Sequence, residues 1–172
     1  MNNNYSAMDI ANYIVWYVNR NPNEPLGTLT PLKLQKILYY VATSFLKSRD
    51  ELLFPEPFQK WQYGPVVKEV YQEFKTVGVN HIQYPKLSLH EKGLAVFGRT
   101  FKPIYEHEII NSDQGLADLI SGVVDKLIDK KAFYLVGLTH KEKAWESFEE
   151  DIMSGKRELT YSTEELYLAE TI

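Results

Sequence analysis

The segment from Thr139 to Trp145 holds the residues whose types and spacing come nearest to catalytic chemistry. His140 and Glu142 lie two positions apart, and an imidazole beside a carboxylate can move protons to and from a substrate. The same segment also has a structural explanation, because Thr139 and Glu142 form the pattern of a helix capping box. His140 would then occupy the first helical position, where the helix dipole disfavours a cation. We therefore expect Thr139, Glu142 and Trp145 to be structural, and keep a small hydrolase-like enzyme using His140 as an alternative.

A second group of residues has the chemistry of a binding surface. Lys33 falls near the start of an expected helix, where the macrodipole favours acids, so its ammonium either pairs locally or faces a partner. Tyr39 and Tyr40 flank the apolar stripe of that helix, and we do not expect both to be fully buried on one face. Tyrosine and tryptophan are also the side chains that anchor protein interfaces. The candidate partner-binding residues are Lys33, Tyr39, Tyr40, Trp61, Tyr63, Tyr71 and His140.

The sequence lacks the short motifs that mark common classes of enzyme. It has no glycine-rich phosphate loop, neither a Walker pattern nor GxGxxG. The metalloprotease pattern HExxH and the nucleophile elbow GxSxG are also missing. The four histidines lie in different segments and there is no cysteine, so no zinc-binding spacing arises. The sequence therefore predicts no catalytic residue, no metal and no cofactor.

Composition narrows the class of protein further. The chain has 172 residues, of which 44% are hydrophobic and 24% charged, as in an ordinary globular protein. No apolar run is long enough to cross a bilayer, the first residues do not resemble a signal peptide, and cysteine is absent. These features favour a cytoplasmic protein without a membrane partner. The net charge of -4 argues against nucleic acid as the partner, since nucleic-acid binders usually carry a basic excess.

Charge is distributed unevenly along the chain. Between Glu146 and Ile172 there are eight acidic and two basic residues, a net charge of -6, so the remainder carries +2. One explanation is a solvated helical face, and the other is an electropositive surface on a partner. Residues 151–172 are accordingly treated as an acidic C-terminal segment.

Most of the sequence has the periodicity and the capping residues of helices. The strongest start is Thr30 followed by Pro31, a hydroxyl N-cap with proline at the first helical position. The Gly64-Pro65 step is interpreted as the start of a helix that ends before Gly78. The other expected helices begin at Ser6 with Asp9, at Asn111 or Ser112, at Thr139 with Glu142 and continuing to Gly155, and at Ser162 with Glu165.

The β content is expected to be small. The run before Gly64 has the alternation of a strand or a loop, and residues 132–138 form an apolar segment of undetermined type. Residues 79–110 have poor periodicity and could hold a short strand near 82–89 or 101–110. No linker or internal repeat divides the chain. The expected fold is mainly α, with residues 1–172 in one compact multi-helix domain that includes a small β hairpin or short sheet.

Three segments together resemble a known family. They are TPLKLQKILYYV at 30–41, FQKWQYGPVVKEVYQEFK at 58–75 and LTHKEKAWE at 138–146. In this order they are similar to the motifs of the Panacea antitoxin domain, the SocA/GepA-like, phage-associated family. The resemblance extends over about residues 7–150.

The resemblance implies a non-catalytic antitoxin of a type II-like toxin–antitoxin system. Such a protein would neutralise a cognate protein toxin, encoded by the adjacent gene, through direct binding. A second role implied by the resemblance is that of a proteolytic adaptor, which delivers the toxin to a AAA+ protease. Residues 79–110 and 151–172 match none of the three motifs, so we expect partner specificity to be set by one of these segments.

Overall fold

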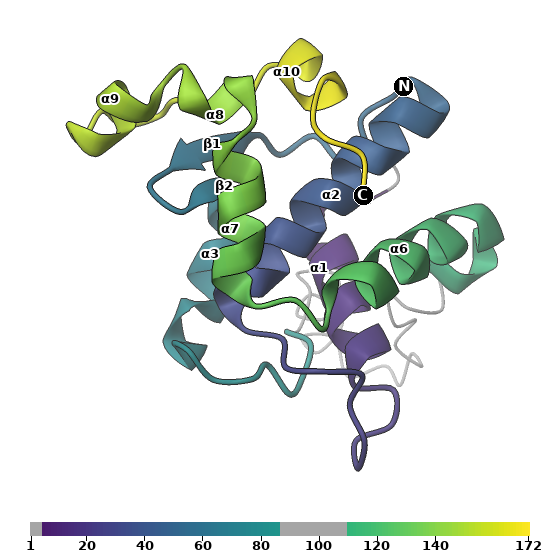
Figure 1. Cartoon of the computed structure of the whole chain (residues 1–172). Coiled ribbons are helices and arrows are strands. Elements are labelled where there is room, and N and C mark those ends of the chain that lie inside the picture. The colour runs from purple at the N-terminus through teal and green to yellow at the C-terminus, as the bar shows by residue number, and fades with distance from the viewer. Residues whose placement is uncertain (1–4, 87–109) are drawn as a thin grey trace, which may run out of the picture.

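The computed structural model describes residues 5–86 and 110–172, which form a bundle of helices with one small sheet (Figure 1). The mainly α fold with a minor β element is thus confirmed. No helix in these two ranges is both long enough and apolar enough to span a membrane. The elements are α1 (Ala7–Val18), α2 (Pro31–Arg49), β1 (Phe58–Trp61), β2 (Gly64–Val67), α3 (Lys68–Phe74), the 3-10 helix η1 (Lys75–Val77), α6 (Gln114–Leu127), α7 (Ala132–His140), α8 (Lys143–Glu146), α9 (Glu149–Met153) and α10 (Thr163–Tyr167).

Helix α2 is the central element of the molecule. Its predicted start is confirmed, because the Thr30 hydroxyl accepts a hydrogen bond from the Lys33 amide and Pro31 is the first helical residue. The helix contacts α1, α3, α6, α7, α10 and β2, and Figure 1 shows it crossing the middle of the molecule. Because neighbours cover it on every side, Tyr39 and Tyr40 are both fully buried. The expectation that they would not both be fully buried is wrong.

The sheet is a hairpin in which β1 and β2 pair antiparallel, with Trp61 opposite Gly64. The prediction that Gly64-Pro65 starts a helix is therefore wrong, since both residues belong to β2 and α3 begins only at Lys68. Two observations explain the difference. Gly64 has φ +87°, which a right-handed helix does not use, and the Pro65 carbonyl accepts a hydrogen bond from a lysine of α2.

The described part of the segment from 79 to 110 contributes no strand to the sheet. Residues 82–86 form no strand, and Ile82 instead donates a backbone hydrogen bond to Leu29, at 2.7 Å. The strands suggested within 87–109 lie outside the described residues. The sheet of the described residues is therefore the two-stranded hairpin at 58–67.

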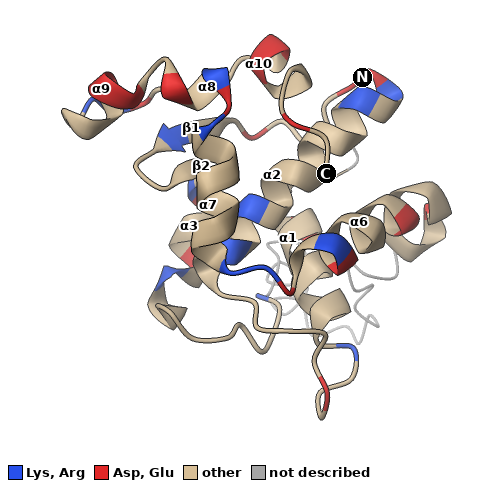
Figure 2. Ribbon diagram, in the orientation of Figure 1, with Lys and Arg blue, Asp and Glu red and all other residues tan. Residues whose placement is uncertain are grey.

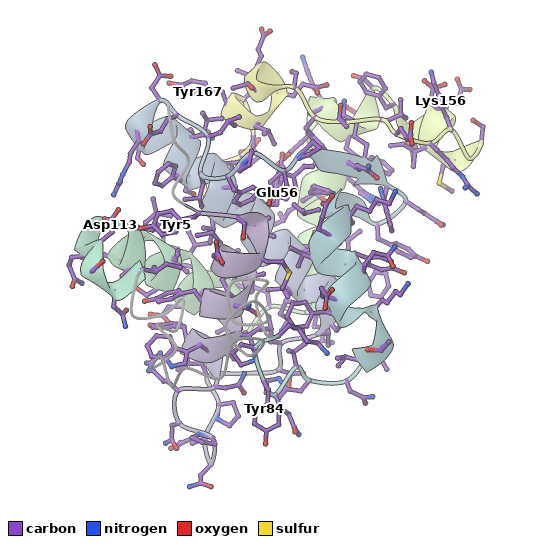
Figure 3. The ribbon with its side chains drawn as sticks, turned by 180° about the vertical axis from the view of Figure 1, so that it is seen from behind. Tyr5, Glu56, Tyr84, Asp113, Lys156 and Tyr167 are labelled. Carbon is purple, nitrogen blue, oxygen red and sulfur yellow. The ribbon has the colours of Figure 1, made fainter. Side chains whose placement is uncertain are left out.

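Helices α1 and α6 pack against α2 from one side. The capping box of Ser6 and Asp9 is confirmed at the start of α1. The N-cap of α6 is Asp113 rather than Asn111 or Ser112, because residues 110–112 are still helical. The Asp113 carboxylate accepts a hydrogen bond from the Leu116 amide and pairs with Arg49 at 3.2 Å. Figure 3 shows Asp113 beside Tyr5, so this cap joins α6 to the end of α2 and to the N-terminal residues.

The apolar segment at 132–138 forms most of α7, which lies against α2 and β2. The capping box expected from Thr139 and Glu142 is wrong. Thr139 lies inside α7 and its hydroxyl donates to the Val136 carbonyl at 2.9 Å, while the Glu142 carboxylate accepts a hydrogen bond from Tyr39 of α2. Partners within the core replace the local cap, and α7, α8 and α9 replace a single helix to Gly155.

The acidic C-terminal segment folds back onto the sheet. The Lys60 amide donates to the Leu159 carbonyl at 2.7 Å, and the Tyr161 amide donates to the Phe58 carbonyl at 2.9 Å. The capping box of Ser162 and Glu165 at the start of α10 is confirmed. Buried side chains of this segment, including Tyr161, join the hydrophobic cluster that begins in α1. Residues 159–169 therefore help to build the core, although the assignment of residues 1–172 to one domain stays a prediction.

Candidate partner-binding site

A fully buried lysine links α2, β2 and α7. The Lys36 ammonium donates a hydrogen bond to the Pro65 carbonyl at 2.9 Å, and burial lowers its pKa to about 7. Gly64 lies directly against it. A Cβ added to Gly64 would be 2.4 Å from the Thr139 Oγ1 and 3.2 Å from the Lys36 Nζ. The three motif segments thus meet at one point where only glycine fits.

A second buried polar group lies farther along α2. The Tyr39 hydroxyl donates to the Glu142 carboxylate at 2.6 Å, and the Glu170 amide donates to the same carboxylate at 3.3 Å. Burial raises the pKa of Glu142. The hydroxyls of Tyr40 and Tyr161 are buried and make no well-aligned hydrogen bond with the described residues, although a weaker interaction links Tyr40 to Glu142. Burial followed by the charge of Glu142 raises the pKa of each. We call Tyr39, Tyr40, Glu142 and Tyr161 the tyrosine–glutamate cluster.

His140 lies apart from this carboxylate and packs on an indole. Its ring stacks on that of Trp145 with centroids 3.6 Å apart, and the Trp145 indole donates to the Trp61 carbonyl at 2.9 Å. Burial lowers the pKa of His140, which keeps the ring neutral, and a backbone hydrogen bond with Gln62 raises it to a smaller extent. Since His140 and Glu142 engage different partners, they do not form an acid–base pair. The contacts of His140 and Trp145 hold the hairpin turn instead.

Three cavities of the described part of the chain are lined in part by residues 161–170. One of about 650 Å³ lies between the end of α2 and α10, and one of about 110 Å³ lies beneath residues 52–58. The third, of about 630 Å³, lies between α8 and the C-terminal residues and reaches Glu142. His140 lines none of the three. None of these three cavities therefore surrounds the base expected for the enzyme alternative.

Three of the predicted partner-binding residues lie inside the protein. The Lys33 ammonium donates to the Ile128 carbonyl at 2.7 Å, and burial lowers the pKa of this lysine. Its local position at a helix start was read correctly, but its partner is the end of α6 rather than another molecule. Tyr39 and Tyr40 belong to the tyrosine–glutamate cluster. Because α2 is covered on all sides, these three residues support the surface from beneath.

The remaining predicted residues keep exposed surface around the hairpin. Trp61 and Tyr71 are half-buried and meet edge to face, with ring centroids 4.9 Å apart. Tyr63 is 48% exposed and its ring lies 5.7 Å from that of Phe133, which is 65% exposed. Partner contact by Trp61, Tyr63, Tyr71 and His140 stays a prediction. Phe133 and Tyr134 were missed, although α7 is apolar on all sides in sequence, which is the signal that could have identified them.

Comparison with known proteins gives one positive finding. The family model described as "Antitoxin SocA-like, Panacea domain" matches residues 34–146. No curated protein and no solved structure gives a significant match. The matched range includes Lys36, the hairpin, α7 and the stacked pair of His140 and Trp145, which are the parts that meet in the structure. This chain belongs to the SocA-like, Panacea-domain antitoxin family.

Proposed function

We propose that this protein is the antitoxin of a two-gene toxin–antitoxin system and neutralises its cognate protein toxin by direct binding. The family match over residues 34–146 carries the proposal. The contacts of the polar motif residues agree with it. Lys36, Thr139 and Glu142 are buried and bonded to other parts of the chain, and His140 is stacked on an indole. These residues build a scaffold, and exposed side chains around the hairpin remain for contact with a partner.

Co-expression with the product of the adjacent gene tests this function. The adjacent product alone should arrest growth, and this protein should restore growth and co-purify with it in a defined ratio. An adjacent product that is harmless alone, or that remains toxic beside this protein, would contradict the proposal. A frameshifted copy of this gene serves as the control for the effect of co-transcription.

The same experiment separates occlusion from delivery to a protease. If the protein acts by binding, the toxin level should stay constant or rise while toxicity falls. If it is an adaptor for a AAA+ protease, the toxin should disappear after synthesis is stopped and should persist in a strain that lacks the protease. We propose occlusion, because the family match implies a protein partner and blocking by binding needs no third component.

A further inference from the structure

Helix α7 is apolar on the side that faces solvent as well as on the side that faces the core. Leu135 and Val136 are buried against the rest of the protein. On the outer side, Phe133 is 65% exposed and Tyr134 is 56% exposed. Gly137 follows one turn after Phe133, and a Cβ built on it would meet open space. A surface helix normally turns polar residues to water, so this outer side has the composition of a contact surface.

The hairpin turn extends this surface. Tyr63 is 48% exposed, and its ring meets that of Phe133 edge to face at 5.7 Å. The turn is held in place from below, because the Trp145 indole donates to the Trp61 carbonyl. Aromatic side chains held on rigid elements lose little conformational entropy when they bind. We call Tyr63, Phe133, Tyr134 and Gly137 the α7 surface.

Lysines flank the α7 surface at both ends of the helix. Lys130 and Lys131 precede α7, and Lys141 and Lys143 follow it. All four are exposed, and within the described residues none of them forms an ion pair. The only carboxylate between residues 130 and 143 is Glu142, which is buried and bonded to Tyr39. Figure 2 shows α7 in tan with blue and red on the chain before and after it, and residues 129–143 hold four lysines against two acids, Asp129 and Glu142, in a chain of net charge -4.

We propose that the α7 surface is the site at which the cognate toxin binds, and that its occupant is an acidic segment of the toxin that also presents apolar side chains. This inference rests on the proposed function. The apolar side chains would pack on the aromatic rings, and the carboxylates would lie opposite the lysines at the two ends of α7. The α7 surface has the usual anatomy of a specific interface, which is an apolar centre surrounded by a polar rim.

Two other occupants fit the observations less well. A nucleic acid would bring its phosphates close to a chain whose residues 146–172 carry a net charge of -6. A second copy of this chain has its largest excess of acids in that same segment, and there Glu165 already pairs with Lys60 and Asp151 with Lys156. A separate acidic protein segment can confine its carboxylates to the two lysine pairs, whereas a nucleic acid carries phosphates along its whole length.

The apolar part is tested with the variant Tyr63→Ser/Phe133→Ser and the adjacent-gene product as the probe. Calorimetric titration should show binding at least about thirtyfold weaker than that of the wild type, as expected for the loss of central aromatic anchors. The matched control is Tyr167→Ser on α10, since Tyr167 is 47% exposed and lies at the edge of the molecule away from α7 (Figure 3). Its affinity should stay within about twofold of the wild type. Circular dichroism establishes that each variant is folded.

The charged rim is tested with Lys130→Glu/Lys131→Glu. Association should slow about tenfold or more, and the dependence of the association rate on salt should weaken. Lys156→Glu/Arg157→Glu is the control, because it reverses another exposed pair of basic neighbours outside the α7 surface, of which Lys156 pairs with Asp151. The control should associate at a rate within about twofold of the wild type.

A photocrosslinker identifies the occupant. p-Benzoylphenylalanine in place of Phe133 should crosslink to a toxin peptide rich in Asp or Glu. A crosslink to a second copy of this chain or to RNA in the presence of toxin would overturn the inference. If both α7 variants bind the toxin with wild-type affinity, the inference about the α7 surface is overturned and the proposed function stays intact. If the wild type does not bind the adjacent-gene product, the inference and the proposed function are both overturned.

Discussion

Two neighbouring regions of this protein reverse the usual placement of polar and apolar side chains. Beneath the hairpin, Lys36, Tyr39 and Glu142 are buried although they are polar or charged. On the outer side of α7, Phe133 and Tyr134 are exposed although they are aromatic. Buried polar groups are costly unless they are bonded, and exposed apolar groups are costly only when they gather in patches. The comparison indicates that the first region fixes the shape of the scaffold, while the second is the surface that we propose for the partner.

The sharpest test of the buried region is Gly64→Ala. The left-handed backbone at φ +87° costs an alanine about 1 to 2 kcal/mol, and the new Cβ would lie 2.4 Å from the Thr139 Oγ1. Together these should lower the free energy of unfolding by about 3 kcal/mol or more, measured by urea denaturation. Gly155→Ala is the matched control, since Gly155 has the same φ of +87° but nothing within 4 Å of the added Cβ. It should lose only about 1 kcal/mol, and equal losses would show that contact with Thr139 is unimportant.

Lys36 offers the next largest effect. Lys36→Ala removes the donor to the buried Pro65 carbonyl and leaves a cavity, so unfolding free energy should fall by about 2 to 3 kcal/mol. Lys36→Met keeps most of the volume and removes the cost of burying an ammonium, so it should match or exceed the wild type near pH 7.

The same residue should give a pH dependence of known sign. The pKa of Lys36 is about 7 in the folded protein against 10.5 in an unfolded chain, so the unfolded chain binds more protons between these values. The free energy of unfolding of the wild type should therefore rise with pH in this window, by about 1 kcal/mol or more. Lys36→Met should lack this contribution between pH 7 and 9.5. A parallel pH dependence in the two proteins would show that the lysine is not desolvated.

A smaller effect separates two adjacent buried tyrosines. Tyr39→Phe removes the donor to Glu142 and should cost about 1 to 2 kcal/mol of unfolding free energy. Tyr40→Phe removes a buried hydroxyl that makes no well-aligned hydrogen bond with the described residues, so stability should be unchanged or slightly higher. Thermal denaturation of the two variants gives the comparison. If Tyr40→Phe is the more destabilising, the hydroxyl of Tyr40 has a partner that the described contacts do not include.

Local patterns predicted those features that depend on neighbouring residues. The caps at Ser6, Thr30 and Ser162 are confirmed because each uses a side chain three positions from its partner amide. Gly64-Pro65 and Thr139 were misassigned for the opposite reason. The conformation of Gly64 depends on the close approach of α7, and Glu142 bonds to Tyr39, which lies 103 positions away. Such pairs leave no periodic trace in a single sequence.

The candidate site shows the same division. Tyr63 could be selected from sequence because it lies in a recognisable motif beside a glycine. Its neighbour Phe133 could not, since an apolar segment reads the same whether a helix is buried on all sides or exposed on one. Only the packing of α7 against α2 and β2 shows which of its residues are left outside.

The smallest expected effect on stability belongs to the exposed region. Phe133→Ala should change the free energy of unfolding by less than about 1 kcal/mol, since the ring is 65% exposed and loses mainly its edge-to-face contact with Tyr63. The same substitution at Phe58, which is 2% exposed, should cost about 3 to 5 kcal/mol. Denaturation of both variants measures the difference directly. A loss at Phe133 that approaches the loss at Phe58 would mean that the α7 surface serves the fold itself, and the contrast between the two regions would fail. A small loss there, combined with weakened toxin binding, would assign the exposed aromatic rings to the partner rather than to the core.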